Sequence, residues 1–384
     1  MDKGSYKVWK SKDLVVTLGP SKLSRFFDPM FRFLLAPFAF LYGVAVTLRN
    51  KFFDWGWLKS EEFDIPIVCV GNLTVGGTGK TPFSEFLIER LAKRYCVALL
   101  SLGYRRRTKG FVEVAVNSSF LKVGDEAKQI KLKFPDIVVA VCEKRAEGIR
   151  RIRELHPEVN LIILDDGFQH RAVEPWVNII LMDYTRPIYH DHLLPWGTLR
   201  DPVSQLHRAH FVIVTKCPLD MNALDQRIVI KSLGLFPYQG LWFTRTIAGS
   251  VTPLFPDVAP EWVLAGDPVI VMAGIARPEP LIRSLGEEYN IVDTLIFRDH
   301  HPYRMRDLQK MERALAQAPP GTVIITTEKD AVKLTNRKRI PISIQRALHF
   351  IPIKTVFCGE GEKNFLQRVE KYVDANQKYS LLHS

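Results

Sequence analysis

The sequence predicts an α/β protein whose larger domain contains a parallel sheet, with a second, smaller α/β domain joined to it. Short, continuously apolar runs alternate with helical stretches, which is the order of parallel strands and their crossover helices. One run, residues 65–70, leads into a glycine-rich turn and then a helical stretch, and another, residues 161–164, ends in two aspartates. Both features are typical of a parallel sheet that carries a site at the carboxyl ends of its strands.

The turn at residues 71–81 reads Gly-Asn-Leu-Thr-Val-Gly-Gly-Thr-Gly-Lys-Thr, which is the composition of a phosphate-binding loop. Glycines let backbone N–H groups converge on a phosphate, Lys80 can reach the β- and γ-oxygens, and the Thr81 hydroxyl can ligate Mg²⁺. The strict pattern asks for glycine at position 74, where this chain has threonine. The strand–turn–helix order still favours a nucleoside triphosphate site over a turn without a ligand. The residues predicted to hold the nucleotide are Thr74, Val75, Gly76, Gly77, Thr78, Gly79, Lys80 and Thr81.

Asp165 and Asp166 follow the apolar run 161–164 and form a Walker B pattern. A P-loop site needs a carboxylate for its metal, and the carboxyl ends of parallel strands meet at one edge of the sheet. Either aspartate alone could instead be a turn or helix-cap residue. Together with the loop at 71–81, they predict a Mg²⁺ site formed by Thr81, Asp165 and Asp166.

The composition describes a folded globular protein. Of the 384 residues, 47% are hydrophobic and 24% are charged, and the length suits two domains of ordinary size. The five cysteines are scattered and lack C-x-x-C spacing, so neither a disulfide framework nor a zinc site is predicted. A reducing compartment, in which ATP is available, fits this pattern best.

Much of the positive charge lies at the start of the chain. The formal net charge is +12, and residues 1–51 hold nine Lys and Arg against three Asp. Residues 33–48 carry no charge and are rich in apolar and aromatic side chains. Basic flanks around such a helix are typical of a segment held at an anionic membrane surface. A basic patch alone would also suit nucleic-acid binding, but no nucleic-acid motif is present.

We expect this helix to lie on the membrane rather than to cross it. Sixteen helical residues span about 24 Å, less than a hydrocarbon core of about 30 Å, and Pro37 interrupts the run. A secretory signal and a buried core helix are the alternative interpretations. An exported protein meets no ATP, which disfavours the signal.

Four parts are predicted along the chain: a basic, apolar segment at 1–50, a P-loop domain at 51–240, a β-ribbon hinge at 241–265 and a C-terminal α/β domain at 266–384. The strands expected in the P-loop domain, besides 65–70, are residues 96–100, 137–141, 161–164, 177–182 and 211–214. The strands expected in the C-terminal domain are 269–272, 291–297, 322–326 and 351–357, with helices near 280–287, 305–317 and 364–375.

Eight short blocks occur in a characteristic order: the loop 71–82, Gly103-Tyr104-Arg105-Arg106, Val123-Gly124-Asp125-Glu126, Asp165-Asp166-Gly167-Phe168-Gln169-His170, residues 193–202, Ala273-Gly274-Ile275, Asp299-His300-His301-Pro302-Tyr303 and Thr327-Glu328-Lys329-Asp330-Ala331. On these blocks the chain resembles the tetraacyldisaccharide 4'-kinases, the lipid A 4'-kinases of Gram-negative bacteria. The resemblance implies a P-loop domain, a β-ribbon hinge and a smaller α/β domain. It also implies transfer of the γ-phosphoryl of ATP, with Mg²⁺, to the 4'-hydroxyl of an acylated disaccharide 1-phosphate at the cytoplasmic face of the inner membrane.

The resemblance extends to single residues. Asp125 is our candidate for the base that takes the proton of the acceptor hydroxyl, and the resemblance pairs His300 with it; Lys80 is the third catalytic candidate. The candidates for substrate contacts are Tyr104, Glu126, Arg145, Gln169, His170, Arg200 and Asp201. Arg105 and Asp201 depart from the family pattern, where glycine and glutamate are usual, and Ala127 replaces a proline.

Other interpretations stay open at this point. Asp125 could simply cap the helix that begins near Ala127, and Gln169 with His170 could serve packing. A P-loop switch or a metallochaperone-like protein at the membrane is the alternative function. A guanine-reading motif would need aspartate where Pro218 follows Thr215-Lys216-Cys217, which favours adenine.

Overall fold

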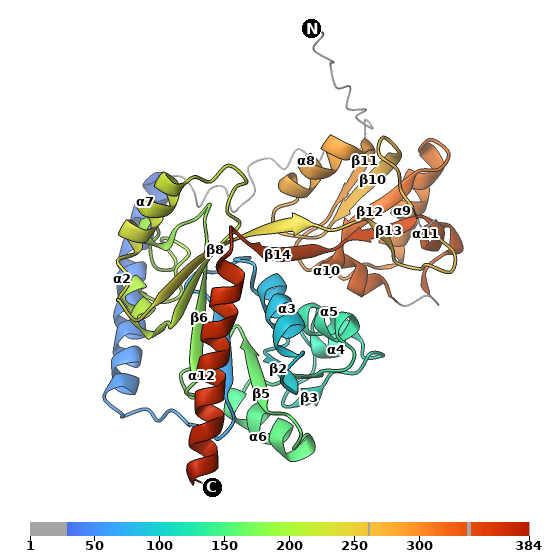
Figure 1. Ribbon diagram of the computed structural model, residues 1–384. Helices are drawn as coiled ribbons and strands as arrows, with labels where there is room; N and C mark the ends of the chain where they lie inside the picture. Colours follow the sequence, from blue (N-terminus) through green and yellow to red (C-terminus); the bar gives the residue numbers. More distant parts are fainter. Residues whose placement is uncertain (1–28, 260–261, 336–338, 384) are drawn as a thin grey trace. The chain divides into compact units, whose positions relative to one another are not determined.

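The computed structural model describes residues 29–259, 262–335 and 339–383 (Figure 1). These residues divide into two compact units. The large unit consists of the described residues up to Ile247 together with those from Lys354 onward, and the inserted unit is Ala248–Ile353. The first 28 residues of the expected basic segment lie outside the described residues.

The large unit is built on a nine-stranded sheet in the order β14-β8-β7-β6-β1-β5-β2-β4-β3. Its strands are β1 Ile67–Gly71, β2 Val97–Ser101, β3 Val112–Glu113, β4 Val138–Val141, β5 Leu161–Asp165, β6 Val177–Asp183, β7 Phe211–Thr215, β8 Gly240–Ala248 and β14 Ile353–Phe357. The pairs from β4 through β8 are parallel, and β3 pairs with β4 antiparallel. Every residue of β1, β2, β5, β6 and β7 is buried, because helices or loops cover both faces, and this explains why these strands are mostly apolar, with polar residues chiefly at their carboxyl ends.

Each face of this sheet has its own hydrophobic core. One core contains side chains of α3 Lys80–Leu91, α5 Asp125–Lys133 and α12 Gly361–His383. The other contains side chains of α6 Arg145–Leu155, α7 Ala223–Leu233 and the segments between residues 168 and 209. The remaining short helices of the large unit are α4 Phe120–Val123, η1 Ile188–His190 and η2 Val203–Arg208.

The inserted unit has a five-stranded sheet in the order β11-β10-β12-β13-β9. Its strands are β9 Thr252–Pro253, β10 Pro268–Ala273, β11 Asn290–Ile296, β12 Val323–Thr327 and β13 Leu348–Ile351, all parallel to their neighbours except β9. Its helices are α8 Glu279–Glu288, α9 Met305–Gln317, α10 Glu328–Ala331, η3 Val332–Leu334 and α11 Ile342–Ala347. Two clusters of buried apolar side chains give this unit a core of its own.

The chain passes between the two units twice, at the neighbouring strands β8 and β14. The Gly249 amide donates to the Pro352 carbonyl and the Cys358 amide to the Phe243 carbonyl, so the two strands run in opposite directions. The expected ribbon therefore takes its second strand from residues 353–357 and not from 249–265.

One expected strand and one expected boundary differ from the structure. Residues 351–357 form two strands, because Pro352 lacks an amide hydrogen and separates β13 from β14, which belong to different sheets. The C-terminal part of the expected domain 266–384 groups with the large unit instead. The reason is packing: Phe365, Val369 and Val373 of α12 are fully buried in the core of the nine-stranded sheet.

Helix α2, Pro29–Asp54, contains the uncharged stretch that the sequence placed at a membrane (Figure 1). One side of it is packed, since Ala39 and Asn50 are buried. The other side exposes a stripe of large apolar side chains at helical spacing: Leu34, Phe38, Leu41, Val44 and Leu48. Among the described residues, no helix is both long enough and apolar enough to cross a bilayer.

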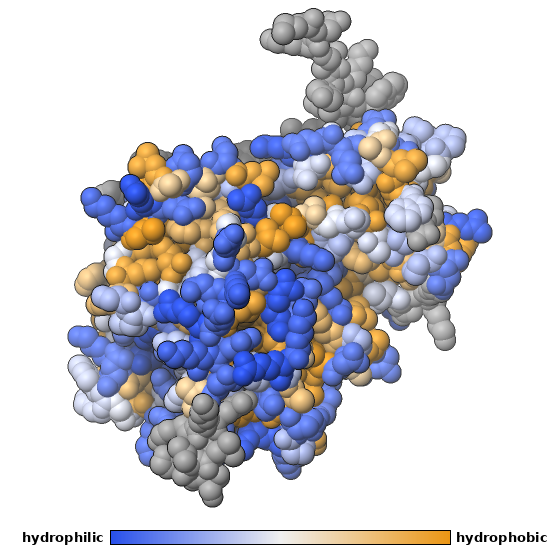
Figure 2. Space-filling view, in the orientation of Figure 1, coloured by the Kyte–Doolittle hydropathy of each residue, from blue (hydrophilic) through white to orange (hydrophobic). Residues whose placement is uncertain are grey.

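A second set of exposed apolar side chains lies on α7. Leu224 and Ile228, one helical turn apart, are 66% and 53% exposed. Figure 2 shows apolar surface in the region where Figure 1 places α7. Arg227 and Lys231 alternate with these residues along the helix, so α7 carries both apolar and positively charged side chains.

Candidate active site

The glycine-rich loop joins β1 to α3 in the large unit, at the carboxyl end of a central strand. Gly79 precedes the helix with a φ of 85°, which glycine adopts without strain. A side chain at Gly71 is excluded, because its Cβ would lie 2.5 Å from the Phe168 Cβ. No side chain caps the first turn of α3. Its backbone N–H groups are therefore positioned as a site for an anion.

Lys80 belongs to a polar network beside the glycine-rich loop. Its Nζ lies 3.3 Å from the Asn72 Oδ1 and 3.5 Å from the Asp166 Oδ1. Arg200 donates two hydrogen bonds to the Asp166 carboxylate, at 2.8 and 3.2 Å, and a third to the Asn72 Oδ1. Asn72 in turn donates to the Thr78 hydroxyl at 2.9 Å, which ties the network to the loop itself.

The two Walker B aspartates differ in their electrostatic surroundings. Burial raises the pKa of Asp165 to about 7, and the nearby carboxylates of Glu126 and Asp166 act in the same direction. Burial also acts to raise the pKa of Asp166, but Lys80 and Arg200 outweigh it and lower that pKa to about 2. Asp165 is thus a buried carboxylate among anions, with one hydrogen bond from the Ser84 hydroxyl at 3.2 Å.

These residues suit the Mg²⁺ that the sequence predicted. Mg²⁺ prefers oxygen ligands and binds through one or two carboxylates together with phosphates and waters. Asp165 lies at the end of β5 and Thr81 is the second residue of α3, so both belong to the same edge of the sheet. Asp165 is buried beside the carboxylates of Glu126 and Asp166, and a cation at this position would offset their mutual repulsion. Among the described residues there is no group of three or more His, Cys, Asp and Glu side chains arranged to hold a metal by themselves.

Asp125 and Glu126 begin helix α5, and Asp125 is 5% exposed. Gly124, with a φ of 89°, is the residue that precedes the helix, and no side chain caps it. The Asp125 Oδ1 accepts a hydrogen bond from the Glu126 amide at 3.1 Å. Asp125 therefore lies inside the first turn rather than at the cap position that the alternative interpretation assigned to it. Glu126 lies close enough to Asp165 to act on its pKa.

The segment that contains Arg200 and Asp201 lies along the glycine-rich loop. The Val75 amide donates to the Thr198 carbonyl and the Arg200 amide to the Leu73 carbonyl, each at 2.7 Å. Helix α2 holds this segment from its other side. The Tyr42 hydroxyl donates to the Arg200 carbonyl at 2.8 Å. Asn50 donates to the Asp201 carboxylate at 3.2 Å, and Asp201 is 2% exposed.

The remaining substrate candidates of the large unit lie at different depths. Tyr104 is 51% exposed. The Gln169 side-chain Nε2 donates to the Asn72 carbonyl at 2.8 Å. Burial, and after it Arg145, lowers the pKa of the neighbouring His170 to about 4, so this imidazole is neutral at pH 7. Arg145 is 3% exposed, and its guanidinium donates to the carbonyls of Cys142 and Asp165. Arg145 therefore links the carboxyl ends of β4 and β5.

Sequence analysis missed two residues beside the loop, Asp183 at the end of β6 and Lys216 just after β7. They form an ion pair at 2.7 Å, and the Lys216 Nζ also donates to the Gly77 carbonyl. The Thr215 hydroxyl donates to the Thr78 carbonyl at 2.8 Å. A polar residue directly after a buried strand is the signal that could have revealed them, as it did for Asp165.

His300, the remaining catalytic candidate, lies in the inserted unit. Its backbone has a φ of 59°, which is unusual for a residue other than glycine, and its side chain is 10% exposed. The imidazole Nε2 lies 3.1 Å from the Lys329 Nζ. The neighbouring His301 contacts Asp307 at 2.9 Å.

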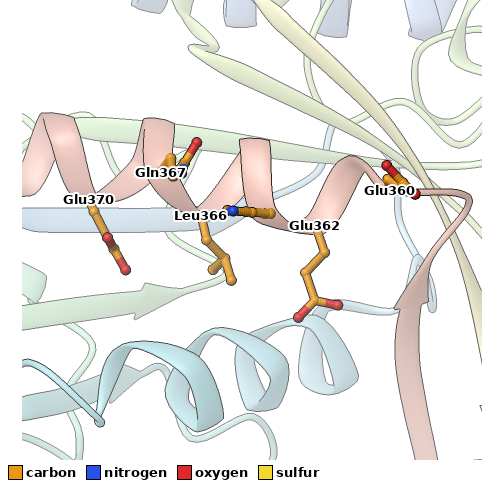
Figure 3. A pocket seen from close by; sticks show the side chains of 6 residues that line it. Glu360, Glu362, Leu366, Gln367 and Glu370 are labelled. Atoms are coloured by element: carbon orange, nitrogen blue, oxygen red, sulfur yellow. The ribbon is translucent and has the colours of Figure 1, made fainter.

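The structure also has a surface groove of about 660 Å³ beside α12, whose lining residues lie between Glu360 and Glu370 (Figure 3). It contains none of the predicted site residues. Arg90 binds Glu362 at 2.7 Å and Arg94 binds Glu370 at 3.2 Å, so two of its acidic residues are paired with cations. The groove is therefore a charged boundary of α12 rather than a second candidate site.

A P-loop at the carboxyl edge of a parallel sheet, with a lysine and two aspartates beside it, defines the class of P-loop nucleotide-binding proteins. A family model described as tetraacyldisaccharide-1-P 4'-kinase matches residues 31–374. The chain belongs to this family, as the resemblance indicated, and is therefore a kinase.

Relatives and a solved structure agree with this assignment. The chain is 42% identical to the tetraacyldisaccharide 4'-kinase of Phocaeicola vulgatus, over 90% of this chain and 96% of the relative. It is 37% identical to that of Flavobacterium johnsoniae, over 90% of this chain and 98% of the relative. The crystal structure of LpxK from Aquifex aeolicus in complex with ATP is similar, with a TM-score of 0.72 and 26% identity over 90% of this chain and 99% of that one. The predicted α/β fold is confirmed.

Proposed function

We propose that this protein transfers the γ-phosphoryl group of ATP to the 4'-hydroxyl of a tetraacyldisaccharide 1-phosphate, giving the bis-phosphorylated lipid A precursor. The proposal rests on one observation above all. In a chain of this family, Lys80 and the amides of α3 lie at the same sheet edge as Asp165 and Asp166. The names of its relatives support the acceptor, and the ATP-bound structure supports the donor nucleotide.

Phosphoryl transfer depends on positioning and on neutralising charge, and the large unit has groups for both. The amides of the glycine-rich loop hold the β-phosphate, and Lys80 stabilises the charge on the transferred group. In the structure the Lys80 ammonium contacts Asn72 and Asp166, which fix its position beside the loop. Bound Mg²⁺, held by Thr81 with Asp165 or Asp166, would neutralise phosphate charge.

For the acceptor, we propose Asp125 as the base that takes the hydroxyl proton and His300 as its partner. Asp125 lies in the first turn of α5, in the same unit as the P-loop, while His300 belongs to the inserted unit. Arg200 contacts Asp166 directly, which supports a role in fixing the metal-side carboxylate. The burial of Arg145 supports an electrostatic role near Asp165.

We further propose that α2 rests on the cytoplasmic face of the bacterial inner membrane. Its exposed stripe, ending near Leu48, is followed by a cluster of aromatic rings: Phe52 stacks on Trp57 at 5.1 Å, and Trp55 contacts Trp57 at 5.6 Å. Trp55 and Trp57 are exposed, and tryptophan favours the boundary between lipid and water. This arrangement supports peripheral attachment and explains how an acylated substrate reaches a P-loop.

The direct test is incubation with γ-labelled ATP, Mg²⁺ and the tetraacyldisaccharide 1-phosphate in detergent. We expect a product labelled at the 4'-position, and we expect Lys80→Ala to reduce its formation by at least a hundredfold because the transition state loses a charge contact. Lys93→Ala, which removes a charge from an exposed position after the same helix, is the control and should retain full activity. ATP hydrolysis without labelled lipid, or normal transfer by Lys80→Ala, would contradict the proposal.

A further inference from the structure

Three of the family blocks, distant in sequence, meet at the carboxyl ends of β10 and β12 in the inserted unit. Their common centre is Asp330, which is fully buried. Its carboxylate accepts hydrogen bonds from the Gly274 amide at 2.7 Å, from the Thr327 hydroxyl at 2.8 Å and from the Lys333 Nζ at 3.0 Å. A buried carboxylate with three donors makes a rigid anchor, since losing any donor would leave charge unsatisfied.

This anchor determines the backbone at His300. The Gly274 amide is bonded to Asp330, and the Gly274 carbonyl accepts a hydrogen bond from the His300 amide at 3.1 Å. A side chain at Gly274 is excluded, since its Cβ would lie 2.9 Å from both the Asp330 Oδ1 and the Tyr303 hydroxyl. The φ of 59° at His300 costs conformational energy, and such strain persists where the surrounding structure enforces it.

Lys329 adds a constraint on the imidazole ring itself. It precedes the anchor Asp330 in the short helix α10, so its backbone is fixed by the same contacts. Its Nζ lies 3.1 Å from the His300 Nε2. An ammonium group has three donors and no acceptor, so this hydrogen bond requires a lone pair on Nε2. The ring proton must then be on Nδ1. The Asp299 carboxylate approaches the same nitrogen only to 3.8 Å, beyond hydrogen-bond distance.

We propose that Lys329 is a positioning residue that fixes the tautomer and the orientation of His300, with Nε2 as acceptor from Lys329 and Nδ1–H as the donor presented to the reaction. This inference rests on the proposed role of His300. It makes that role specific: His300 offers an N–H donor, and it does not itself receive the proton of the acceptor hydroxyl. The hydrogen bonds around Asp330 hold the backbones of Lys329 and His300, and they thereby maintain the distance between the two side chains.

The test uses the full-length protein with ¹⁵N-labelled histidine, and the signals of His300 are assigned by their loss in His300→Ala. The ¹⁵N shifts report which ring nitrogen carries the proton, independently of activity. We expect the wild type and Lys329→Arg to show Nδ1–H, since arginine also donates without accepting. In Lys329→Met we expect a mixture of tautomers. Lys310→Met, which removes an exposed lysine of the same unit, is the matched control and should give the wild-type spectrum.

Kinetics on the same preparations provide the second measurement. We expect Lys329→Met to lower the single-turnover rate about tenfold to a hundredfold, the effect of losing one charge-assisted hydrogen bond, with little change in the KM for ATP. Lys329→Arg should recover most of the rate, which a purely structural role of Lys329 does not explain.

Two results would overturn the inference: an Nε2–H tautomer in the wild type, or an unchanged His300 spectrum in Lys329→Met. A normal rate in His300→Ala would instead remove the proposed role of His300. The tautomer measurement would still decide whether Lys329 fixes the ring, so the two failures are distinguishable. Thermal melts of each variant show whether a lost rate reflects unfolding.

Discussion

At the scale of single residues, the site separates two adjacent carboxylates into different roles. Asp166 is paired with Lys80 and Arg200, and its pKa falls to about 2, while the pKa of buried Asp165 rises to about 7. Two neighbouring groups with the same chemistry thus differ because Asp165 is fully buried beside Glu126 and Asp166, whereas Lys80 and Arg200 offset the burial of Asp166. Asp165 is consequently the group whose ionisation a bound cation would favour most.

This difference predicts how stability depends on pH in the absence of nucleotide and metal. The folded-state pKa of Asp165 lies above its ordinary value of 3.8, so its contribution to stability is lost as the pH rises from about 4 to about 7. Asp165→Asn removes the buried charge. We expect the variant to be more stable than the wild type at pH 8, by about 2–4 kcal/mol, with little difference at pH 4. Denaturant unfolding at both pH values measures this.

Asp136→Asn, on the exposed turn before β4, is the control and should follow the wild type at both pH values. Equal stability of Asp165→Asn and the wild type at pH 8 would show that Asp165 has an ordinary pKa. Catalysis by Asp165→Asn should fall even as its stability rises, which is the usual relation between a functional charge and folding.

Sequence reasoning found the residues whose type and spacing carry the chemistry, such as Lys80 and Asp165. It missed Asn72 as a centre of hydrogen bonding, although Asn72 lies inside the recognised loop. Its four contacts come from residues as distant as Gln169 and Arg200, and no local pattern encodes such partners. The burial of Arg145 could not be predicted from the sequence either, because burial depends on which helix covers the strand ends.

At the scale of elements, α2 connects a surface to the site. Its exposed stripe contains Phe38 and Leu41, and on its other side Tyr42 and Asn50 hold the segment at residues 200–201. The apolar run in the sequence predicted a helix with a membrane-facing side. The run could not predict that α2 packs against the segment at residues 200–201. The hydrogen-bond partners of Tyr42 and Asn50 are distant in sequence, and nothing in the local pattern indicates them.

If the stripe binds lipid, polar substitutions on it should weaken membrane binding without harming the fold. We expect Phe38→Ser combined with Leu41→Ser to reduce binding to anionic vesicles at least tenfold, because two large side chains lose their burial in the lipid. Unfolding should be little changed, as both side chains are more than 60% exposed. Co-sedimentation with vesicles, with ATP binding as a check on folding, measures the effect.

Leu155→Ser, an exposed apolar residue at the end of α6, provides the control and should sediment like the wild type. Undiminished sedimentation of the double variant would assign membrane binding to another surface, and the apolar side chains of α7 would be the next to test.

At the scale of the whole molecule, one unit is inserted into another. Local periodicity predicted most of the longer strands of both units and, in the inserted unit, α9 at its observed bounds, but it did not predict α6, α7 or α11. It could not predict that residues 354–384 return to the first sheet, because α12 has the same amphipathic pattern whichever sheet it covers. The packing of buried α12 side chains decides between them, such as that of Phe365 against the rings of Phe83 and Phe211.

The insertion predicts that the large unit can fold without the inserted one. The Gly249 amide donates to the Pro352 carbonyl at 2.8 Å, so the two crossing points are adjacent. Replacing residues 250–351 by an Asn-Gly turn should join β8 to β14 as a hairpin. We expect this protein to bind ATP within a few-fold of the wild-type affinity, and to lose phosphoryl transfer because His300 is removed. Calorimetric ATP titration and the transfer assay measure both.

As a control, the same replacement carrying Lys80→Ala should bind ATP poorly, which shows that binding occurs at the P-loop. A soluble but unfolded product would mean that the large unit depends on the inserted one for its stability.

The position of α12 also determines the order in which a newly made chain can mature. Residues of α12 complete the core beneath α3, yet the ribosome makes them after the whole inserted unit. The inserted unit can therefore fold during translation while the P-loop still lacks part of its support, which reverses the usual progression from the N-terminus. We therefore expect that the chain does not bind nucleotide productively until α12 has been made, and that a message cut short before residue 365 yields no partly active enzyme.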